Sequence, residues 1–248
     1  MSEWRRESLI LPDWPAPARV RAVSTTRLGG VSASPYDSLN LAEHVGDDPA
    51  HVAENRRRLA QMLGYAAEPA WLDQVHGARV INAGMVREPV AADAAWTRTP
   101  GQPCVVMTAD CLPVLLCDGE GTMAAAAHGG WRGLAQGVIA ATVASMKVPP
   151  AELLAWLGPA IGPAAFEVGE EVRAAFLALE VGNAGCFRPS PAGRWLADLY
   201  ELARRQLRAL GVSAIYGGAY CTFSEPERFF SYRRENRTGR MATLIWLD

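Results

Sequence analysis

The chain has 248 residues, and 50% of them are hydrophobic, so it is long enough to bury a large core. Its 24 lysines and arginines are balanced by 26 aspartates and glutamates, which gives a formal net charge of −2. No overall positive field is available to hold a polyanion, and we therefore predict no nucleic-acid partner.

The N-terminal stretch has no segment typical of export or membrane insertion. Its longest apolar run, Leu9 to Leu11, is far shorter than a signal-peptide core or a membrane span. The chain has 5 cysteines, an odd number without paired spacing, which fits a reducing compartment better than a disulfide framework. We expect a cytoplasmic protein with no membrane contact, built as a single domain over residues 1–248.

The first predicted helix covers residues 48–64. Asp48 is a good N-cap, Pro49 takes the first helical position and Gly64 follows the end. A second helix is expected to begin near Leu134 and to run toward Met146.

Two further helices are predicted in the C-terminal half, over residues 167–179 and 196–211. In the later one, leucines recur on or near one face, at positions 196, 199, 202, 207 and 210, and Gly211 marks the end.

Short β-like runs lie between and around these helices. Strands outnumber helices, and several are too short and too close together for parallel crossovers, which favours a mixed α/β or α+β sandwich with largely antiparallel sheets. The runs cover residues 18–25, 70–75, 78–82, 104–109, 113–117, 122–127, 152–158, 214–220 and 242–247.

Two of these runs, "PVLLC" and "TMAAAA", predict a β-hairpin closed by residues 118–121. If Cys117 faces Thr122, the same register makes Cys111 and His128 cross-strand partners at the open end. Their Cβ atoms would then be about 4.5 to 5.5 Å apart, which suits two ligands of one metal ion. Pro113 cannot donate to the ladder, so it must lie at a strand start or an edge.

A third ligand is offered by His76 in "QVHG", at another junction of strand and turn. Two histidines and one cysteine are the ligand set of a catalytic zinc with one open position, whereas a closed structural site needs four ligands. The alternative is that these are core or rim residues at strand ends. His44 and His51 are weaker candidates, and buried thiols are expected at Cys104, Cys117, Cys186 and Cys221.

Several ordered motifs resemble the YfiH-like or laccase-domain family from about Ser24 to Leu247. They are "SLNLAEHVGDD", "QVHG", "TADCLPVLLCD", "AAAHGGWRG", "WLGPAIGP" and "FFSYRRENRTGRMATLIWL". The family was first described as polyphenol oxidase and later as purine nucleoside phosphorylase with adenosine deaminase activity. The resemblance implies a layered αββα sandwich and a single zinc ion held by His76, Cys111 and His128.

Phosphorolysis of adenosine, inosine or S-methyl-5′-thioadenosine requires sites for phosphate, ribose and base. The family motifs mark Arg56 and Arg233, and a guanidinium fork suits phosphate, although an arginine run in a helix is also typical of a solvated face. Asn40 is predicted to contact ribose or base, with the capping of a loop as the alternative.

Deamination of adenosine also fits a zinc ion, since zinc acidifies water for attack at C6 of adenine. The nearest acid is Asp110, beside Cys111, which would serve as the general acid or, alternatively, hold the turn or orient a histidine ligand.

Two other functions are open. A copper-dependent polyphenol oxidase needs clusters of histidines that 4 histidines cannot supply, so zinc is expected and copper is secondary. Some family members edit cell-wall precursors, which the sequence does not separate from the nucleoside chemistry. The expected partners are small molecules, purine nucleosides and phosphate.

Overall fold

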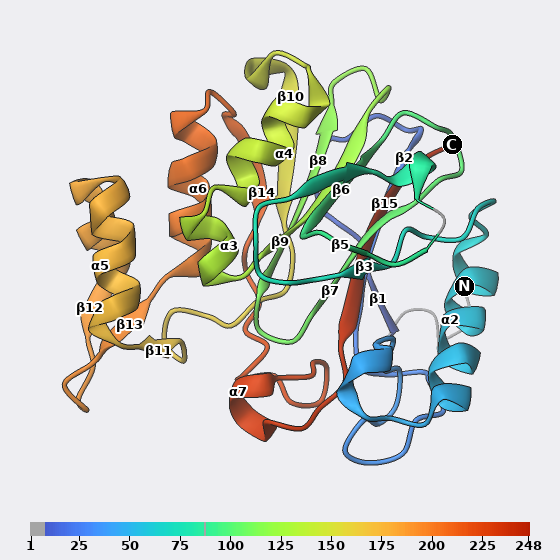
Figure 1. Ribbon diagram of the computed structural model, residues 1–248, viewed down its shortest axis with the longest axis horizontal. Helices are drawn as coiled ribbons and strands as arrows, with labels where there is room; N and C mark the ends of the chain where they lie inside the picture. Colours follow the sequence, from blue (N-terminus) through green and yellow to red (C-terminus); the bar gives the residue numbers. More distant parts are fainter. Residues whose placement is uncertain (1–7, 87) are drawn as a thin grey trace.

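The computed structural model describes residues 8–86 and 88–248, whose elements stack as four layers (Figure 1). One central layer is a six-stranded sheet in the order β14-β10-β8-β9-β6-β4. Its outer pairs, β14 with β10 and β6 with β4, are parallel, and the other neighbours are antiparallel. The strands are β4 (Val80–Asn82), β6 (Ala94–Thr97), β8 (Leu112–Asp118), β9 (Ala124–Gly129), β10 (Leu153–Leu157) and β14 (Ala214–Gly217).

The second central layer is a four-stranded antiparallel sheet in the order β1-β2-β15-β7. It comprises β1 (Leu9–Ile10), β2 (Val20–Thr25), β15 (Met241–Leu247) and β7 (Cys104–Thr108). Two small sheets complete the strands. They pair β3 (Leu72–Asp73) with β5 (Val90–Ala91), and β13 (Trp195–Ala197) with β11 (Glu167–Val168) and β12 (Phe187–Pro189).

Helices form the two outer layers, with α3, α4 and α6 on one side of the sheets and α2 on the other (Figure 1). The α-helices are α2 (Pro49–Leu63), α3 (Trp131–Ala135), α4 (Val138–Met146), α5 (Glu170–Leu179), α6 (Leu199–Ala209) and α7 (Tyr232–Glu235). Short 3-10 helices are η1 (Glu43–Val45), η2 (Ala83–Met85), η3 (Pro150–Glu152) and η4 (Val181–Cys186). Among the described residues, no helix has the length and apolar character needed to cross a membrane.

Alternating side chains explain the layers, because successive residues of a strand point to opposite faces. In β8, Val114 and Leu116 pack toward the helices α4 and α6, whereas Leu115 packs between the two sheets. In β15, Ile245 belongs to the same inter-sheet core, and Leu244 packs outward against the α2 side. Both sheets are therefore buried on both faces, and the predicted αββα sandwich is confirmed.

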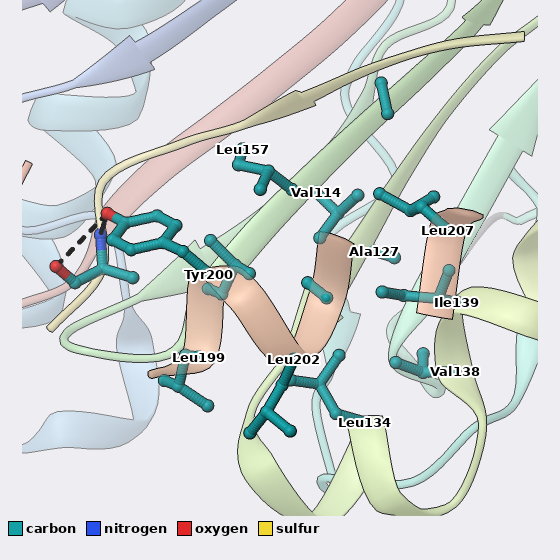
Figure 2. Close-up of a cluster of buried hydrophobic side chains, with 14 of the residues drawn as sticks. Val114, Ala127, Leu134, Val138, Ile139, Leu157, Leu199, Tyr200, Leu202 and Leu207 are labelled. Carbon is teal, nitrogen blue, oxygen red and sulfur yellow. Dashed lines mark hydrogen bonds between the residues drawn. The ribbon is translucent and has the colours of Figure 1, made fainter. Parts of the chain in front are cut away.

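Figure 2 shows the core between the six-stranded sheet and its helices. Leu207 of α6 lies beside Ile139 of α4, and Leu202 of α6 lies beside Leu134 of α3. Val114 and Ala127 of the sheet belong to the same cluster. Ala125 and Ala127 of β9 belong to this core, and His128 follows them directly in the same strand.

Helix α2 matches its prediction, with the Asp48 side chain accepting from the Ala50 N–H and Gly64 in the left-handed conformation at the C-cap. The predicted helix over 134–146 differs. It begins earlier, at Trp131, and is interrupted because Gly137 takes a left-handed backbone, φ 86°, which separates α3 from α4. The two later helices begin after short strands, so Leu196 belongs to β13 and not to α6.

The predicted hairpin exists between β8 and β9, but its predicted register is wrong by two residues. Cys117 pairs with Ala124, and His128 pairs with Pro113, the second residue of β8. The turn is wider because the Asp118 carboxylate accepts from the N–H groups of Thr122, at 2.7 Å, and Met123, at 2.9 Å. A shift of two residues leaves every side chain on its expected face.

Candidate metal centre

His76, Cys111 and His128 come together at one end of the six-stranded sheet. Cys111 directly precedes β8, His128 lies near the end of β9, and His76 sits in the turn between β3 and β4. One ligand atom from each residue lies within 4.8 Å of the others. The two imidazole rings meet edge to face at an interplanar angle of 65°.

This donor set fits one metal ion. Around a tetrahedral zinc ion, neighbouring nitrogen and sulfur ligands are about 3.3 to 3.6 Å apart, so the three side chains need to close by only about 1 Å. Gly130 keeps the space open, because a Cβ atom there would lie 2.9 Å from His76 Nδ1 and 3.1 Å from Cys111 Sγ. Imidazole and thiolate are ligands for zinc and also for copper, so the donor chemistry alone does not choose between them.

The two histidines favour a thiolate at Cys111. Burial by itself raises the pKa of this thiol, but His128 and His76 beside it lower the pKa to about 6. The pKa of His128 changes in the opposite direction. Burial alone would lower it, but Cys111 and Asp93 beside the ring raise the pKa to about 9. A thiolate is the form that binds metal and reacts with electrophiles.

This shift predicts the alkylation chemistry of the metal-free protein. Iodoacetamide should modify Cys111 at pH 7 faster than Cys104 or Cys117, whose thiol pKa values are raised by burial. Because the pKa of Cys111 is lowered, its reactivity should persist at neutral pH and fall as the pH drops through about 6. Peptide mapping by mass spectrometry measures the extent of alkylation at each cysteine. Equal labelling of all three thiols, or no protection by added zinc, would contradict the assignment.

Asp93, which precedes β6, contacts two of the three candidate ligands. Its buried carboxylate accepts from His128 Nδ1 at 2.8 Å, from the His76 N–H at 2.9 Å and from the Gly77 N–H at 2.7 Å. The first contact leaves His128 Nε2 for a metal, since a bonded ring nitrogen fixes the tautomer. The backbone contacts hold His76 in its left-handed conformation, φ 59°.

A cavity of about 510 Å³ opens beside the three candidate ligands, which form part of its lining. No aspartate or glutamate is among the described residues that line it, and two arginines are. Besides the ligands, the lining comprises His44, Gln74, Met107, Thr108, Ala109, Trp131, Arg132, Tyr232 and Arg240. His44 therefore shares the cavity, although it lies outside the ligand cluster.

The carboxylate of Asp110 does not line this cavity. It accepts from the Thr222 hydroxyl at 2.6 Å and from the Arg233 N–H at 2.7 Å. Asp110 itself has φ 90°. These contacts are typical of a residue that holds a turn, and the contact with a histidine ligand is made by Asp93 instead.

Arg56, Arg233 and Asn40 also lie outside the cavity lining. The Arg56 guanidinium stacks at 4.0 Å on Trp71 and donates to the carbonyl of Leu41 at 3.0 Å. The Arg233 guanidinium donates to the backbone carbonyl of Glu167 at 2.7 Å. The structure thus brings the three predicted ligands together and leaves these two guanidinium groups bound elsewhere.

Asn40 is fully buried and uses its amide on the chain itself. Its Oδ1 accepts from the N–H groups of Ala42, at 3.1 Å, and Arg240, at 3.0 Å, and its Nδ2 donates to Asp47 at 2.9 Å. These are the contacts of a loop-capping asparagine, and one of them reaches a residue of the cavity.

Sequence reasoning missed Asp93, Gly130 and Arg240 as parts of the site. For Asp93 a signal was present, because a single acid stands inside the apolar run "AADAAW", and a buried carboxylate needs partners. Arg240 was one of four arginines in a single segment, and the family motif marked Arg233 in its place.

Comparison with known proteins gives consistent matches along the chain. A family model described as multi-copper polyphenol oxidoreductase laccase matches residues 21–248. A Pseudomonas aeruginosa protein named purine nucleoside phosphorylase is 60% identical over 240 residues, covering 96% of this chain and 98% of that protein. Escherichia coli purine nucleoside phosphorylase YfiH is 54% identical, with the same two coverages of 96% and 98%.

Solved structures agree with the fold. A crystal structure of a Neisseria meningitidis protein superposes with a TM-score of 0.94 at 52% identity, covering 97% of this chain and 99% of that chain. Geobacillus stearothermophilus YlmD superposes with a TM-score of 0.90 at 32% identity, covering 97% and 96%.

Proposed function

The chain belongs to the family of YfiH-like, laccase-domain proteins, and on this premise we propose that it is a zinc-dependent purine nucleoside phosphorylase. Its substrates would be adenosine, inosine or S-methyl-5′-thioadenosine, together with phosphate. One observation carries the proposal: the His76, Cys111 and His128 cluster opens into a cavity lined by arginines and aromatic rings and by no described carboxylate. The relatives named purine nucleoside phosphorylase support the same reaction.

The histidine arrangement favours a single ion over multicopper oxidation. All four histidines lie in the described part of the chain, and only His76 and His128 join the ligand cluster. His51 lies on α2, 3.9 Å from Asp47, and His44 lines the cavity outside the cluster. Electron relay between several coppers needs more imidazole ligands than this site offers. When bound, zinc would supply a Lewis acid.

The cavity residues suit the three parts of the reaction. In phosphorolysis a phosphate oxygen bonds to C1′ of the ribose as the bond from C1′ to N9 breaks, and the purine leaves. Positive charge grows on the ribose, so an anion held beside it stabilises the transition state. The rings of Trp131 and Tyr232 offer faces on which a purine can stack, and the arginines offer forks for phosphate.

We propose adenosine deamination as a second, slower activity of the same cavity. It requires a group that carries protons, and the candidate for this role is His44, which lines the cavity. Burial, together with Arg240, lowers the pKa of His44, so its imidazole is neutral and able to accept a proton at pH 7. We expect both activities in the cytoplasm, where the five cysteines would stay as the free thiols of the structure.

A product assay on adenosine tests the proposal. With phosphate present, the zinc-loaded protein should release adenine and ribose 1-phosphate, and without phosphate inosine should form slowly. A phenol oxidase would instead follow copper loading and ignore phosphate. A protein that binds zinc but converts no nucleoside would contradict the purine assignment and direct attention to cell-wall precursors.

A further inference from the structure

Arg240 stands where the loop after α7 enters β15, and the chain holds it from several sides. Its backbone N–H donates to the buried Asn40 side chain at 3.0 Å. Its Nη1 donates to the carbonyls of Thr238, at 2.8 Å, and Gly239, at 3.0 Å. The guanidinium also lies 5.7 Å from the centre of the Tyr232 ring. One edge of the guanidinium is therefore used to fix the side chain in place.

The other edge has no partner in the described part of the chain. Neither Nε nor Nη2 of Arg240 donates a hydrogen bond there, and no described carboxylate lies within 4.0 Å of its guanidinium nitrogens. The side chain is nevertheless partly buried, and this burial lowers its pKa. The negative charges of Cys111 and Asp110 favour the protonated form of Arg240 from a distance, but no acceptor of the described residues contacts its Nε and Nη2 edge. Partly buried donors without an acceptor are unfavourable unless solvent or a ligand supplies one.

The other arginines of the same segment are engaged elsewhere. Arg234 pairs with Glu235 at 3.0 Å, and Arg233 donates to the Glu167 carbonyl. Arg237 donates from Nε to the Tyr36 hydroxyl at 2.8 Å and lines a smaller hollow that shares Arg240 and His44 with the metal cavity. Arg240 is thus the arginine of this segment that lines the metal cavity.

Arg132 is the other arginine of the cavity, and it differs in how it is held. Its guanidinium lies over the ring of its own neighbour, Trp131, at 4.6 Å, and the residue is exposed. A side chain fixed before binding loses less entropy when the ligand arrives, so Arg240 is the better organised of the two.

We infer that Arg240 binds the phosphate co-substrate through its free Nε and Nη2 edge, beside the metal ligands and away from Arg56 and Arg233. The two parallel N–H groups of that edge match two oxygens of a phosphate. The identity of the anion rests on the proposed function. The site itself rests on the free Nε and Nη2 edge of this guanidinium and on a cavity lining without described carboxylates.

Calorimetric titration of inorganic phosphate into zinc-loaded protein, without nucleoside, tests this inference. Arg240→Lys keeps the positive charge but loses the two parallel N–H donors of the guanidinium. Arg240→Gln loses both the charge and this pair of donors. We expect phosphate affinity to fall roughly 10-fold in the first variant and roughly 100-fold in the second, at unchanged zinc content. In turnover assays the KM for phosphate should rise more than the KM for nucleoside.

Two further variants sharpen the result. Arg57→Lys, on the exposed face of α2 where Arg57 pairs with Glu54, is the matched control and should bind phosphate normally. Arg233→Lys tests the competing site and should also bind normally. Wild-type affinity in Arg240→Gln, loss in Arg233→Lys, or no phosphate binding by the wild-type protein would each overturn the inference. Phosphate binding that depends on Arg240, in a protein that splits no nucleoside, would sustain it and reject the proposed function.

Discussion

Cys111→Ala is expected to lose the metal ion and with it more than about 99% of phosphorolysis. Loss of an outer contact to a metal ligand already costs about 10- to 100-fold in metal affinity, and loss of the thiolate itself should cost more. The fold should survive, because an open three-ligand site is not what holds these layers together, and Cys111 belongs to none of the three hydrophobic clusters.

Metal analysis after dialysis, with adenine release measured in parallel, checks this prediction. Cys221→Ala is a suitable control, because Cys221 is also a partly buried free thiol but accepts from the Gly162 N–H outside the ligand cluster. An unchanged melting temperature in Cys111→Ala would separate metal loss from unfolding. Retention of one equivalent of zinc by this variant would show that the ligand assignment is wrong.

Asp93→Ala should lower both metal affinity and stability. Without the carboxylate, His128 loses its orienting partner, and the N–H groups of His76 and Gly77 lose their acceptor. We expect zinc affinity to fall about 10- to 100-fold. A buried donor left unpaired costs about 1 to 3 kcal/mol. Only the His128 Nδ1 donor is fully buried, whereas the two backbone N–H groups are partly exposed to solvent, so the free energy of unfolding should fall by about 1 to 3 kcal/mol.

Asp118→Ala is the matched control, because Asp118 is another buried acid that binds backbone N–H groups, at the opposite end of the same hairpin. It should destabilise the fold and leave zinc affinity unchanged. If Asp93→Ala folds poorly, Asp93→Asn keeps the shape and permits the metal titration. Equal zinc affinity in Asp93→Asn and the wild-type protein would count against the orienting role.

The same carboxylate sets a pH dependence in the metal-free protein. Burial alone would raise the pKa of Asp93, but His128 and the Gly77 N–H lower the pKa below its usual value. A carboxyl with a lower pKa in the folded state stabilises the fold above its unfolded pKa, about 3.9, and this contribution is lost as the pH falls through the folded value. Wild-type protein should therefore lose stability on acidification below about pH 4 more steeply than Asp93→Asn, as measured by denaturant titration.

The sequence predicted the sandwich class and the proximity of the three candidate ligands better than the geometry between them. Helix α2 was predictable because Asp48, Pro49 and Gly64 are local signals that act within one turn. The hairpin register was not, because the Asp118 side chain widens the turn by contacts that a count of residues does not reveal. The ligand pair survived this error, since Cys111 and His128 both stand at the open end of the hairpin.

The substrate contacts were harder to predict for a different reason. Whether an arginine is free depends on partners that are distant in sequence, such as Glu167 for Arg233 and Leu41 for Arg56. The same holds for Asp93, whose contacts with His76 and His128 arise only when β6, β9 and the turn after β3 converge. Motifs identify residue types at such positions, whereas tertiary packing decides which of their polar groups remain available.

Catalysis by one zinc ion is tested most directly by titrating metal-depleted protein with zinc while phosphate-dependent release of adenine from adenosine is followed. This mechanism predicts activity that rises linearly and reaches its plateau at one zinc ion per chain, with none in Cys111→Ala at any zinc concentration. Full activity in the metal-depleted protein, or activity that appears only with several copper ions per chain, would contradict it.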